Sequence, residues 1–268
     1  MVPSAEWPAD LLSGQVAVVT GGASGLGRAT ALRLASAGVS GVVVADLQEQ
    51  PREGGATTTA RLDEMGVASV FVPCDVASVS SVYDAVGAAD ELGGVSILVP
   101  AAGVARFEDV LEVSEEHFDT TMNVNVKGTF FACQAAARSM IAAGRRGAIV
   151  TISSVGGVMG SASMPTYNIS KGAVRMLTYS LAASLGPQGI RVNAVHPGVV
   201  ETAMTTQDTD LASEPGTTVP LGRLGQPIDV ADAVVYLASP LSGYVNGTSL
   251  FVDGGAHSSK PGRQFWRF

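Results

Sequence analysis

The chain has 268 residues, of which 46% are hydrophobic and 15% charged, and its formal net charge is −8 at neutral pH. This composition favours one globular domain with a large core and excludes a disordered chain. The acidic balance, without a run of Lys or Arg, argues against a surface that binds nucleic acid or membranes.

Short Val-rich runs alternate with helical patterns along the chain. Strands that are apolar on both faces are typical of a parallel sheet between two helix layers. The sequence therefore predicts a single doubly wound α/β Rossmann domain over 1–268, with about seven parallel strands, helices on both faces, and a strand order that the pattern leaves open. The strand-like runs are 15–20, 41–46, 68–75, 95–103, 147–154, 190–198 and 248–255. The helical patterns are 25–38, a polar stretch ending at Gly66, 78–91 capped by Ser78, 114–143 capped by Ser114, 165–185, and a short helix after Pro227.

A glycine-rich turn follows the first strand-like run. The segment TGGASGLG (20–27) leads from 15–20 into the helical pattern 25–38. At such a place one glycine permits a tight turn, another lets backbone N–H groups approach a pyrophosphate, and the helix N-terminus adds about half a positive charge. Taken alone, the segment also fits a plain strand-to-helix turn.

The second strand-like run ends on a carboxylate, Asp46, nineteen residues beyond the last glycine of the turn. This is close to the spacing of an acid that binds the adenosine ribose. A carboxylate accepts hydrogen bonds from ribose hydroxyls and repels a 2′-phosphate. Neither Leu47, which follows it, nor Ser24 in the turn is a cation, and Arg28 is expected to face solvent or a neighbouring acid. The sequence therefore predicts NAD rather than NADP as the cofactor.

Tyr167 and Lys171 lie four residues apart in the helical pattern 165–185, so a helix places them on one face. Only three lysines occur in the chain, and one of them stands here among apolar residues. The pair alone fits coincidence. Together with the glycine turn and Asp46, it indicates a dinucleotide-dependent site.

These motifs, taken in order over about 11–255, resemble those of the short-chain dehydrogenase/reductase family. TGGASGLG resembles the family's TGxxxGxG turn, and YNISK resembles its YxxxK motif. Ser154 lies thirteen residues before Tyr167, as the family's serine does, and the run NVKG favours Asn125 over Asn123 as the fourth position. The resemblance implies four catalytic residues: Asn125, Ser154, Tyr167 and Lys171.

The resemblance also implies which residues hold the cofactor. Asp75 resembles the adenine-contacting acid, and HPGVVET (196–202) resembles the segment that meets the nicotinamide. One departure is PAAG (100–103), where the family has NNAG, which leaves open how the loop beside the adenosine ribose is braced. The implied cofactor contacts are Gly21, Ser24, Gly25, Leu26, Gly27, Asp46, Leu47, Asp75, Val76, Ala101, Ala102, Gly103, Tyr167, Lys171, Pro197, Gly198, Val200 and Thr202.

A division of roles among the catalytic residues follows from the resemblance. Tyr167 takes the hydroxyl proton of an alcohol or donates a proton to a carbonyl, Ser154 hydrogen-bonds the substrate oxygen, and Asn125 holds a water that relays protons. A tyrosine titrates near ~10 and needs about 4 kcal/mol of help to act near neutrality. A lysine ammonium about 4 Å away supplies roughly that at an effective dielectric of ~20. We therefore expect Lys171 to lower the pKa of Tyr167 and to bind the nicotinamide ribose.

The substrate side is predicted less sharply. Residues 199–227 form a Gly-, Pro- and Thr-rich substrate loop, whose part 203–220 is expected to close over the substrate. If four apolar residues that the resemblance places near the pocket do line it, the substrate is apolar near its carbinol carbon, and the alternative is ordinary core packing. These residues are Phe107, Met159, Met164 and Met204.

Residues 1–12 are expected to be an N-terminal extension and 256–268 a C-terminal tail. The aromatic residues of the tail pack on a neighbouring subunit, cover its pocket, or are disordered. The resemblance implies a homotetramer built on the helices near 115–143 and 165–185, with a dimer as the alternative.

The cysteines and histidines indicate no metal site. Cys74 and Cys133 are far apart and lack CxxC spacing, which is typical of core thiols in a reducing compartment. His117, His196 and His257 have no metal-ligand spacing, so structural or surface roles are favoured. The N-terminal segment lacks the bases and apolar run of a signal peptide, and no apolar run is long enough to span a bilayer. A cytoplasmic protein is expected.

Three functions are compatible with these features. The favoured one is an NAD-dependent oxidoreductase that transfers hydride between a secondary alcohol, or its ketone, and nicotinamide, with a small-molecule substrate and no nucleic-acid or membrane partner. The second is an NADP-dependent 3-oxoacyl-thioester reductase, against which Asp46 and the net charge weigh. The third is a nucleotide-sensing protein with an inactive site, which the intact Asn-Ser-Tyr-Lys set argues against.

Overall fold

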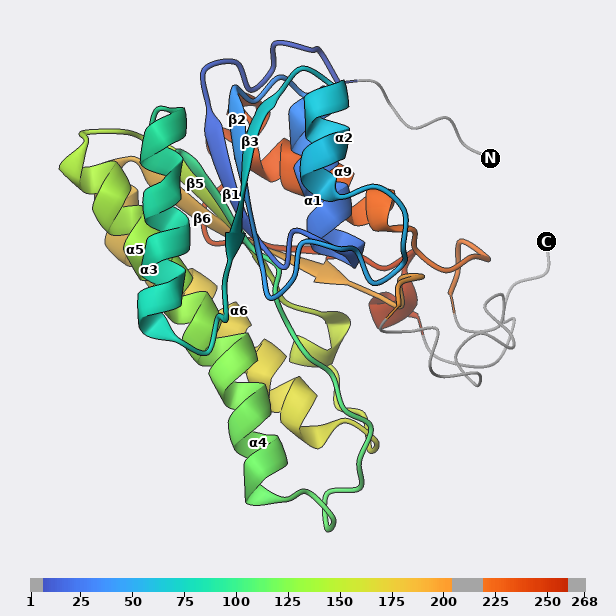
Figure 1. Cartoon of the computed structure of the whole chain (residues 1–268). Helices are drawn as coiled ribbons and strands as arrows, with labels where there is room; N and C mark the ends of the chain where they lie inside the picture. The colour runs from blue at the N-terminus through green and yellow to red at the C-terminus, as the bar shows by residue number, and fades with distance from the viewer. Residues whose placement is uncertain (1–6, 204–218, 260–268) are drawn as a thin grey trace.

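A parallel sheet forms the centre of the computed structural model, which describes residues 7–203 and 219–259 (Figure 1). Within that part of the chain the sheet has seven strands in the order β3-β2-β1-β4-β5-β6-β7, and every neighbouring pair is parallel. This confirms the doubly wound fold and supplies the strand order. The strands are β1 (Val16–Thr20), β2 (Gly41–Asp46), β3 (Ala68–Pro73), β4 (Ile97–Pro100), β5 (Gly147–Ile152), β6 (Ile190–Pro197) and β7 (Ser249–Val252).

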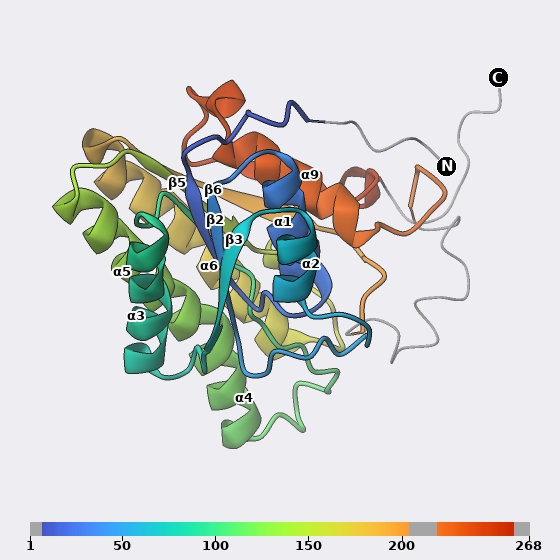
Figure 2. The ribbon, with the colours of Figure 1, turned by 45° about the horizontal axis from the view of Figure 1, so that its top comes forward.

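Helices cover both faces of the sheet, as Figures 1 and 2 show from two directions. One layer holds α1, α2 and α9, and the other holds α3, α4, α5 and α6. Their bounds are α1 (Gly25–Ser36), α2 (Thr58–Glu64), α3 (Val79–Gly87), α4 (Glu115–Met122), α5 (Thr129–Ala142), α6 (Pro165–Leu185) and α9 (Pro227–Ala238). Short helical turns follow or join them: η1 (Ala88–Leu92), η2 (Asn123–Gly128), η3 (Val155–Gly157), η4 (Gly186–Gln188), η5 (Pro240–Ser242) and η6 (Ala256–Ser258).

The apolar strands separate two hydrophobic cores. In β1, Ala17 and Val19 pack into the cluster under α1 and α9, whereas Val16 and Val18 pack into the cluster under α3, α5 and α6. Successive side chains of a strand point to opposite faces, so a strand buried on both sides must be apolar throughout. This is why the Val-rich runs of the sequence do not alternate with polar residues.

Some helix and strand boundaries differ from those predicted. Ser78 and Ser114 do cap their helices, each accepting a hydrogen bond from a backbone N–H three residues on. The helix after Ser78, however, ends at Gly87 and tightens into the 3₁₀ turn η1. The helix after Ser114 contains the π-helical segment η2 between α4 and α5. The strand predicted over 95–103 ends at Pro100, because the next N–H groups turn toward Thr20.

The strand order places a crevice between β1 and β4. The chain winds from β1 toward β3 in one direction and from β4 toward β7 in the other, so the connections leave these two neighbours on opposite faces of the sheet. In such sheets ligands bind at the carboxyl ends of the strands where the winding reverses. Those ends face the lower side of Figure 1, toward α4. The glycine turn after β1 and the PAAG segment after β4 both lie there.

Candidate active site

Two glycines of the turn after β1 are required by close backbone packing. Gly21 has φ +67°, and a Cβ there would lie 2.8 Å from Cα and N of Ala102. A Cβ on Gly27 would collide with the carbonyl oxygen of Gly21. Gly25 is different, because its φ is +53° and the nearest atom to an added Cβ is a methyl of Thr202 at 3.8 Å. The Cα side of Gly25 therefore adjoins open space with room for a phosphate group, while its N–H donates to Glu53 Oε1 at 3.1 Å.

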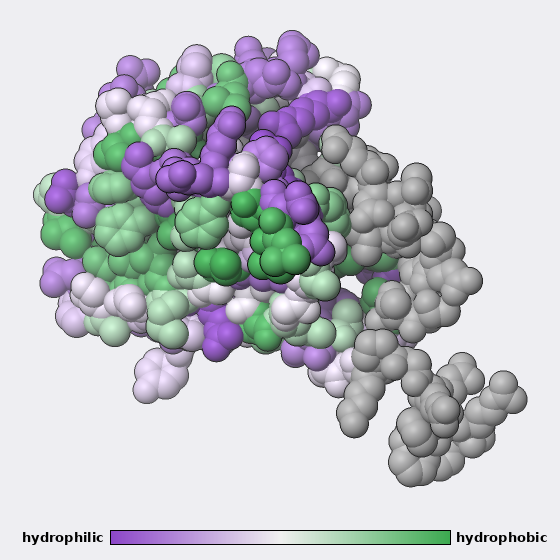
Figure 3. Space-filling model, turned by 90° about the horizontal axis from the view of Figure 1, so that it is seen from below, coloured by the Kyte–Doolittle hydropathy of each residue, from purple (hydrophilic) through white to green (hydrophobic). Residues whose placement is uncertain are grey.

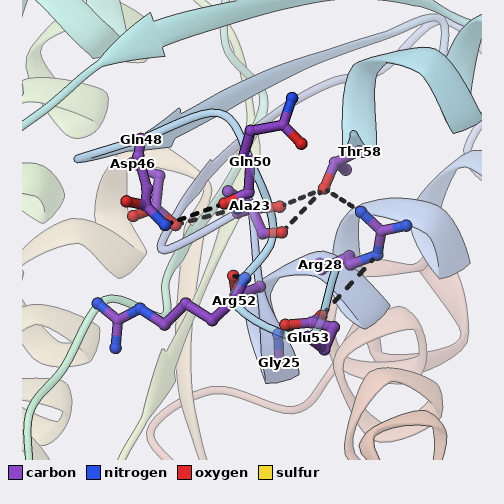
Figure 4. A network of polar contacts seen from close by, with 11 residues as sticks. Ala23, Gly25, Arg28, Asp46, Gln48, Gln50, Arg52, Glu53 and Thr58 are labelled. Atoms are coloured by element: carbon purple, nitrogen blue, oxygen red, sulfur yellow. Dashed lines mark hydrogen bonds and ion pairs between the residues drawn. The ribbon is translucent and has the colours of Figure 1, made fainter. Parts of the chain in front are cut away.

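The carboxylate at the end of β2 is held by two backbone N–H groups. Ala23 N donates to Asp46 Oδ2 at 3.0 Å, and Leu47 N donates to Asp46 Oδ1 at 2.8 Å. The first contact ties β2 to the glycine turn, and Figure 4 shows both groups side by side. Each carboxylate oxygen retains a lone pair, so Asp46 still accepts hydrogen bonds from a ligand hydroxyl.

One cleft brings together most of the residues predicted to hold a cofactor. Of the predicted set, Pro197, Gly198, Val200, Tyr167 and Lys171 do not line this cleft, although Lys171 Nζ lies near Gly103, which does. Its lining includes Arg52 and Cys74, neither of which was predicted as a cofactor contact. The cleft is lined by Gly21, Ser24, Gly25, Leu26, Gly27, Asp46, Leu47, Arg52, Cys74, Asp75, Val76, Ala101, Ala102, Gly103, Val104, Val124, Thr202 and Ala203.

The PAAG departure is braced by a threonine. Ala101 N donates to the carbonyl oxygen of Thr20 at 3.1 Å, and Ala102 N donates to Thr20 Oγ1 at 3.3 Å. Thr20 is buried at the end of β1, and its carbonyl and hydroxyl oxygens accept both hydrogen bonds. Sequence reasoning missed this role, although Thr20 is the first residue of the glycine motif.

A π-helical turn positions Asn125. The side chain is 1% exposed, its Oδ1 accepts from Val104 N at 2.8 Å, and its Nδ2 donates to the carbonyl oxygen of Val104 at 2.9 Å. Nδ2 also donates to Ser170 Oγ at 2.9 Å, which links η2 to α6. Asn123 is exposed, so the structure separates the two candidates. Widened turns of this kind are frequent at functional sites.

Ser154, Tyr167, Lys171 and Asn125 lie around two glycines. A Cβ added at Gly156 would lie 3.5 Å from both Ser154 Oγ and a ring carbon of Tyr167. A Cβ added at Gly103 would lie 3.3 Å from Asn125 Oδ1 and 3.7 Å from Lys171 Nζ. The four side chains, which come from η2, the N-cap of η3 and α6, therefore meet at the end of the cleft.

The lysine of this group is buried and its charge is poorly solvated. Lys171 is 7% exposed, and its Nζ donates to the carbonyl oxygen of Ile152 at 2.9 Å and lies 5.6 Å from the centroid of the Tyr167 ring. Burial lowers the pKa of Lys171 from 10.5 to about 8.

The prediction that Lys171 lowers the pKa of Tyr167 is wrong for this arrangement. Burial raises the pKa of Tyr167 above its ordinary value, and the side chain of Ser154 only partly opposes this rise in the pKa. The assumed separation of about 4 Å between phenol and ammonium does not apply, because the ammonium lies over the ring and is turned toward Ile152. Tyr167 therefore keeps its proton at neutral pH.

Behind Ser154 lies a histidine that sequence reasoning treated as scattered. His196 on β6 is fully buried, and its Nδ1 contacts the carbonyl oxygen of Ser154 at 2.8 Å. Its ring packs against Phe251, with centroids 4.8 Å apart. Burial lowers the pKa of His196, and the hydrogen bond to Ser154 partly opposes the shift. The neutral ring then donates through Nδ1 and holds the peptide that carries Ser154.

The two cysteines are buried, and two further histidines each pair with an acidic side chain. Cys74 and Cys133 are free and buried, and burial raises the pKa of both thiols, that of Cys133 to about 12. His117 pairs with Glu108 at 2.8 Å and His257 with Asp253 at 2.7 Å. No group of His, Cys, Asp or Glu that could hold a metal ion occurs in residues 7–203 or 219–259. Over the same ranges, no helix is both long and apolar enough to cross a bilayer.

Two of the apolar residues that the resemblance places near the substrate reach the surface. Seen from the side of the strand carboxyl ends, hydrophobic residues gather in patches between hydrophilic ones (Figure 3). Phe107 and Met159 are 48% and 44% exposed, which excludes ordinary core packing for both. Met204, most of the predicted closing segment 203–220 and the tail beyond 259 lie outside the described residues.

Comparison with known proteins places the chain among dehydrogenases. A family model described as enoyl-(acyl carrier protein) reductase matches residues 21–257. An L-rhamnose 1-dehydrogenase (NAD(P)(+)) from Azotobacter vinelandii is 39% identical over 249 residues, which are 91% of this chain and 97% of that protein. An L-2,3-butanediol dehydrogenase from Corynebacterium glutamicum is 39% identical over 254 residues, which are 90% and 98% of the two chains.

A solved structure has the same fold along nearly the whole chain. It is that of an Agrobacterium tumefaciens protein with bound NADP, described as a candidate 2-deoxy-D-gluconate 3-dehydrogenase. The TM-score is 0.85 at 36% identity, and the match covers 94% of this chain and 99% of the other.

Proposed function

Because the chain belongs to the short-chain dehydrogenase/reductase family, we propose that it is an NAD(H)-dependent dehydrogenase that interconverts a secondary alcohol and its ketone. The observation that carries this proposal is the meeting of Ser154, Tyr167, Lys171 and Asn125 at the end of a cleft that begins at a glycine turn. A protein that only sensed nucleotides would not need a half-buried phenol beside a buried ammonium, because burying the ammonium is unfavourable.

The cleft fits a dinucleotide. The Cα of Gly25 adjoins open space, the first residues of α1 line the cleft, and Asp46 and Asp75 line it too and would accept hydrogen bonds from hydroxyl and amine groups. When bound, the nicotinamide supplies the hydride acceptor or donor. Lys171, the nearest cation to Gly103, is the residue that would meet the ribose on that side.

Tyr167 acts as the proton donor and acceptor. Because burial raises its pKa, the phenol is protonated at neutral pH and donates to a carbonyl oxygen during ketone reduction. Alcohol oxidation needs the phenolate, so its rate rises through the alkaline range. The Ser154 hydroxyl lies close to the Tyr167 ring, since both flank Gly156, and we propose that it holds the substrate oxygen beside the phenol. His196 keeps the Ser154 peptide in position.

We propose NAD as the preferred cofactor because of Asp46. Its carboxylate is fixed by Ala23 N and Leu47 N, and it meets a ribose with hydrogen-bond acceptors and a negative charge. A 2′-phosphate at the same place is repelled by that charge.

The substrate side favours an apolar alcohol. Phe107 and Met159 are exposed, and the segments that carry them are joined because Glu108 N donates to the carbonyl oxygen of Ser163 at 2.9 Å. If both side chains line the substrate pocket, they favour a substrate with apolar groups near the carbinol carbon. The family-model description keeps 3-oxoacyl thioesters as a second candidate substrate class.

Apolar residues exposed on α4, α5 and α6 support an assembly. Phe118, Phe130, Ile169 and Met176 are 38%, 39%, 52% and 58% exposed. We propose that these helices bury such residues in a homotetramer, with a dimer as the alternative. Light scattering coupled to size-exclusion chromatography measures which state forms, and a monomer would contradict the proposal.

The function is tested by screening secondary alcohols, sugars and steroids with NAD, and 3-oxoacyl thioesters with NADPH, while following the near-ultraviolet absorbance of the reduced cofactor. With an active substrate in hand, Tyr167→Phe is expected to lower kcat by roughly a hundredfold or more, because it removes the exchangeable proton. NAD binding, measured by calorimetry, should remain. Tyr179→Phe is the matched control, since it removes a hydroxyl from the same helix at a bond to Ser249. Retained turnover in the Tyr167 variant would exclude its proton-transfer role.

A further inference from the structure

A charged turn between β2 and α2 packs against the glycine turn. Gly54 N donates to the carbonyl oxygen of Pro51 at 2.9 Å, which closes a turn over 51–54 (hereafter the 51–54 turn). Pro51 is buried, whereas Arg52 and Glu53 at the tip are exposed. The two tip residues carry opposite charges and lie beside the N-terminus of α1 (Figure 4).

Two hydrogen bonds fix the tip of the 51–54 turn to the glycine turn. Arg52 N donates to Ser24 Oγ at 2.8 Å, and Gly25 N donates to Glu53 Oε1 at 3.1 Å. Ser24 is the N-cap residue of α1 but makes no side-chain cap of its own. The carboxylate of Glu53 takes an N–H of the helix start instead, which is favourable at a helix N-terminus.

The neighbouring Arg28 reinforces this arrangement. Its Nε lies 4.0 Å from Glu53 Oε1, and its Nη1 donates to Thr58 Oγ1 at 3.4 Å. Thr58 in turn donates to the carbonyl oxygen of Gly22 at 2.9 Å. As expected, Arg28 faces a neighbouring acid, and the charge of Glu53 is already engaged.

Arg52 is left as an uncompensated cation in the cleft. Its side chain lines the cleft together with Ser24 and Asp46. Among residues 7–203 and 219–259, none forms a hydrogen bond or ion pair with its guanidinium, and Figure 4 shows it extended away from Glu53. Because Ser24 Oγ already accepts from Arg52 N, the hydroxyl proton of Ser24 remains free to be donated.

The other donors at the end of β2 are already used. Ala23 N and Leu47 N both donate to Asp46. An anionic group beside the adenosine ribose must therefore be met by the guanidinium and by the Ser24 hydroxyl. We propose that Arg52, with Ser24, binds the 2′-phosphate of NADP(H) and gives this enzyme a second, weaker cofactor. The inference rests on the proposed dinucleotide-dependent function, and it replaces the expectation that no cation is available near Asp46.

The two charges near the ribose have opposite effects on the two cofactors. Asp46 repels the 2′-phosphate and makes NADP the weaker ligand. Arg52 offers a planar fork of donors that matches a phosphate group. Since the side chain is exposed, added salt should weaken its contribution.

The test compares two small probes that differ in the 2′-phosphate: adenosine 2′,5′-bisphosphate and adenosine 5′-monophosphate. Calorimetry on the full chain measures both dissociation constants for the wild type, Arg52→Ala and Arg61→Ala. Arg61 is the matched control, because its loss changes the net charge equally while its Nε pairs with Glu64 on α2 at 3.3 Å, away from the cleft lining. Arg52→Ala is expected to weaken the bisphosphate relative to the monophosphate by about tenfold, as for one charge-assisted phosphate contact. Arg61→Ala should leave this ratio within twofold.

Kinetics supply the second readout. The ratio of kcat/KM for NADP to that for NAD should fall about tenfold in Arg52→Ala, lie in between in Arg52→Lys, and stay unchanged in Arg61→Ala. If Arg52→Ala weakened both probes equally, Arg52 would contact a group that the two probes share, and the inference would be overturned. An unchanged affinity for both probes would also overturn it. If the wild type reduces neither cofactor, the proposed function fails, while the calorimetric ratio still decides the role of Arg52.

Discussion

Replacing Lys171 by methionine should make the protein more stable at neutral pH and inactive. Lys171 is one of three lysines and sits almost wholly buried in α6. Methionine has similar length and no charge, so the exchange removes an ammonium from an apolar site without leaving a large cavity. The active site thus contains a group whose charge opposes folding.

The magnitude follows from the lowered pKa. A change from 10.5 to about 8 corresponds to about 3 kcal/mol at about 1.4 kcal/mol per pH unit. The variant also loses the hydrogen bond from Nζ to the carbonyl oxygen of Ile152, worth about 1 kcal/mol. At pH 7 the free energy of unfolding of Lys171→Met should exceed that of the wild type by about 2 kcal/mol.

The pH dependence separates the charge from other effects of the substitution. Below pH 8 the amine is protonated in both the folded and the unfolded state, and the full penalty is present. Between about 8 and 10.5 the folded state has lost the proton and the unfolded state has not, so the stability of the wild type rises with pH. The advantage of the variant should therefore shrink by about 2–3 kcal/mol between pH 7 and pH 10.

Urea unfolding at both pH values, at matched protein concentration, measures this difference. Lys127→Met is the control, because Lys127 is exposed and its Nζ also donates to a backbone carbonyl oxygen, that of Ala77 at 3.1 Å. The control should show little difference at either pH. The reasoning is refuted if Lys171→Met has the same advantage at pH 10 as at pH 7, or if it is less stable than the wild type at pH 7.

Two further predictions concern the glycine turn and the histidine behind Ser154. Gly27→Ala should weaken NAD binding more than tenfold in calorimetry and lower the free energy of unfolding by roughly 1–3 kcal/mol, because the added methyl meets the carbonyl oxygen of Gly21. Gly87→Ala is the control, because its added methyl meets no atom within 4 Å. Equal behaviour of the two variants would contradict the packing argument. His196→Asn should reduce acid sensitivity: burial lowers the pKa of His196, so the folded state resists protonation and the wild type loses stability as the pH falls below about 6.5. Urea unfolding at pH 7 and pH 5 measures the free energy of unfolding lost on acidification. This loss should be larger in the wild type than in the variant, by at most about 2 kcal/mol. An identical loss in both proteins would show that other groups cause the acid sensitivity.

Features that depend on neighbouring positions in the chain could be predicted from the sequence. The strand–turn–helix unit around Gly21, Asp46 at the end of the second strand, and the Tyr167–Lys171 spacing each lie within one local unit whose geometry follows from backbone preferences. The Val-rich strands likewise revealed a sheet buried on both faces. These local patterns were sufficient for the fold class and for the identity of the candidate site.

Other features depend on contacts between residues far apart in the sequence, and only the tertiary structure decided them. The strand order arises from the packing of separate elements. So do the hydrogen bond from Ala102 N to Thr20, 82 positions away, and the hydrogen bond from Val104 N to Asn125. The pKa of Tyr167 was predicted with the wrong direction because desolvation is set by everything that surrounds the ring, not by its helical neighbour. Arg52 was missed for the same reason: its distance from Ser24 is 28 positions along the chain, and it becomes a neighbour of the cleft only because the 51–54 turn folds back onto the glycine turn.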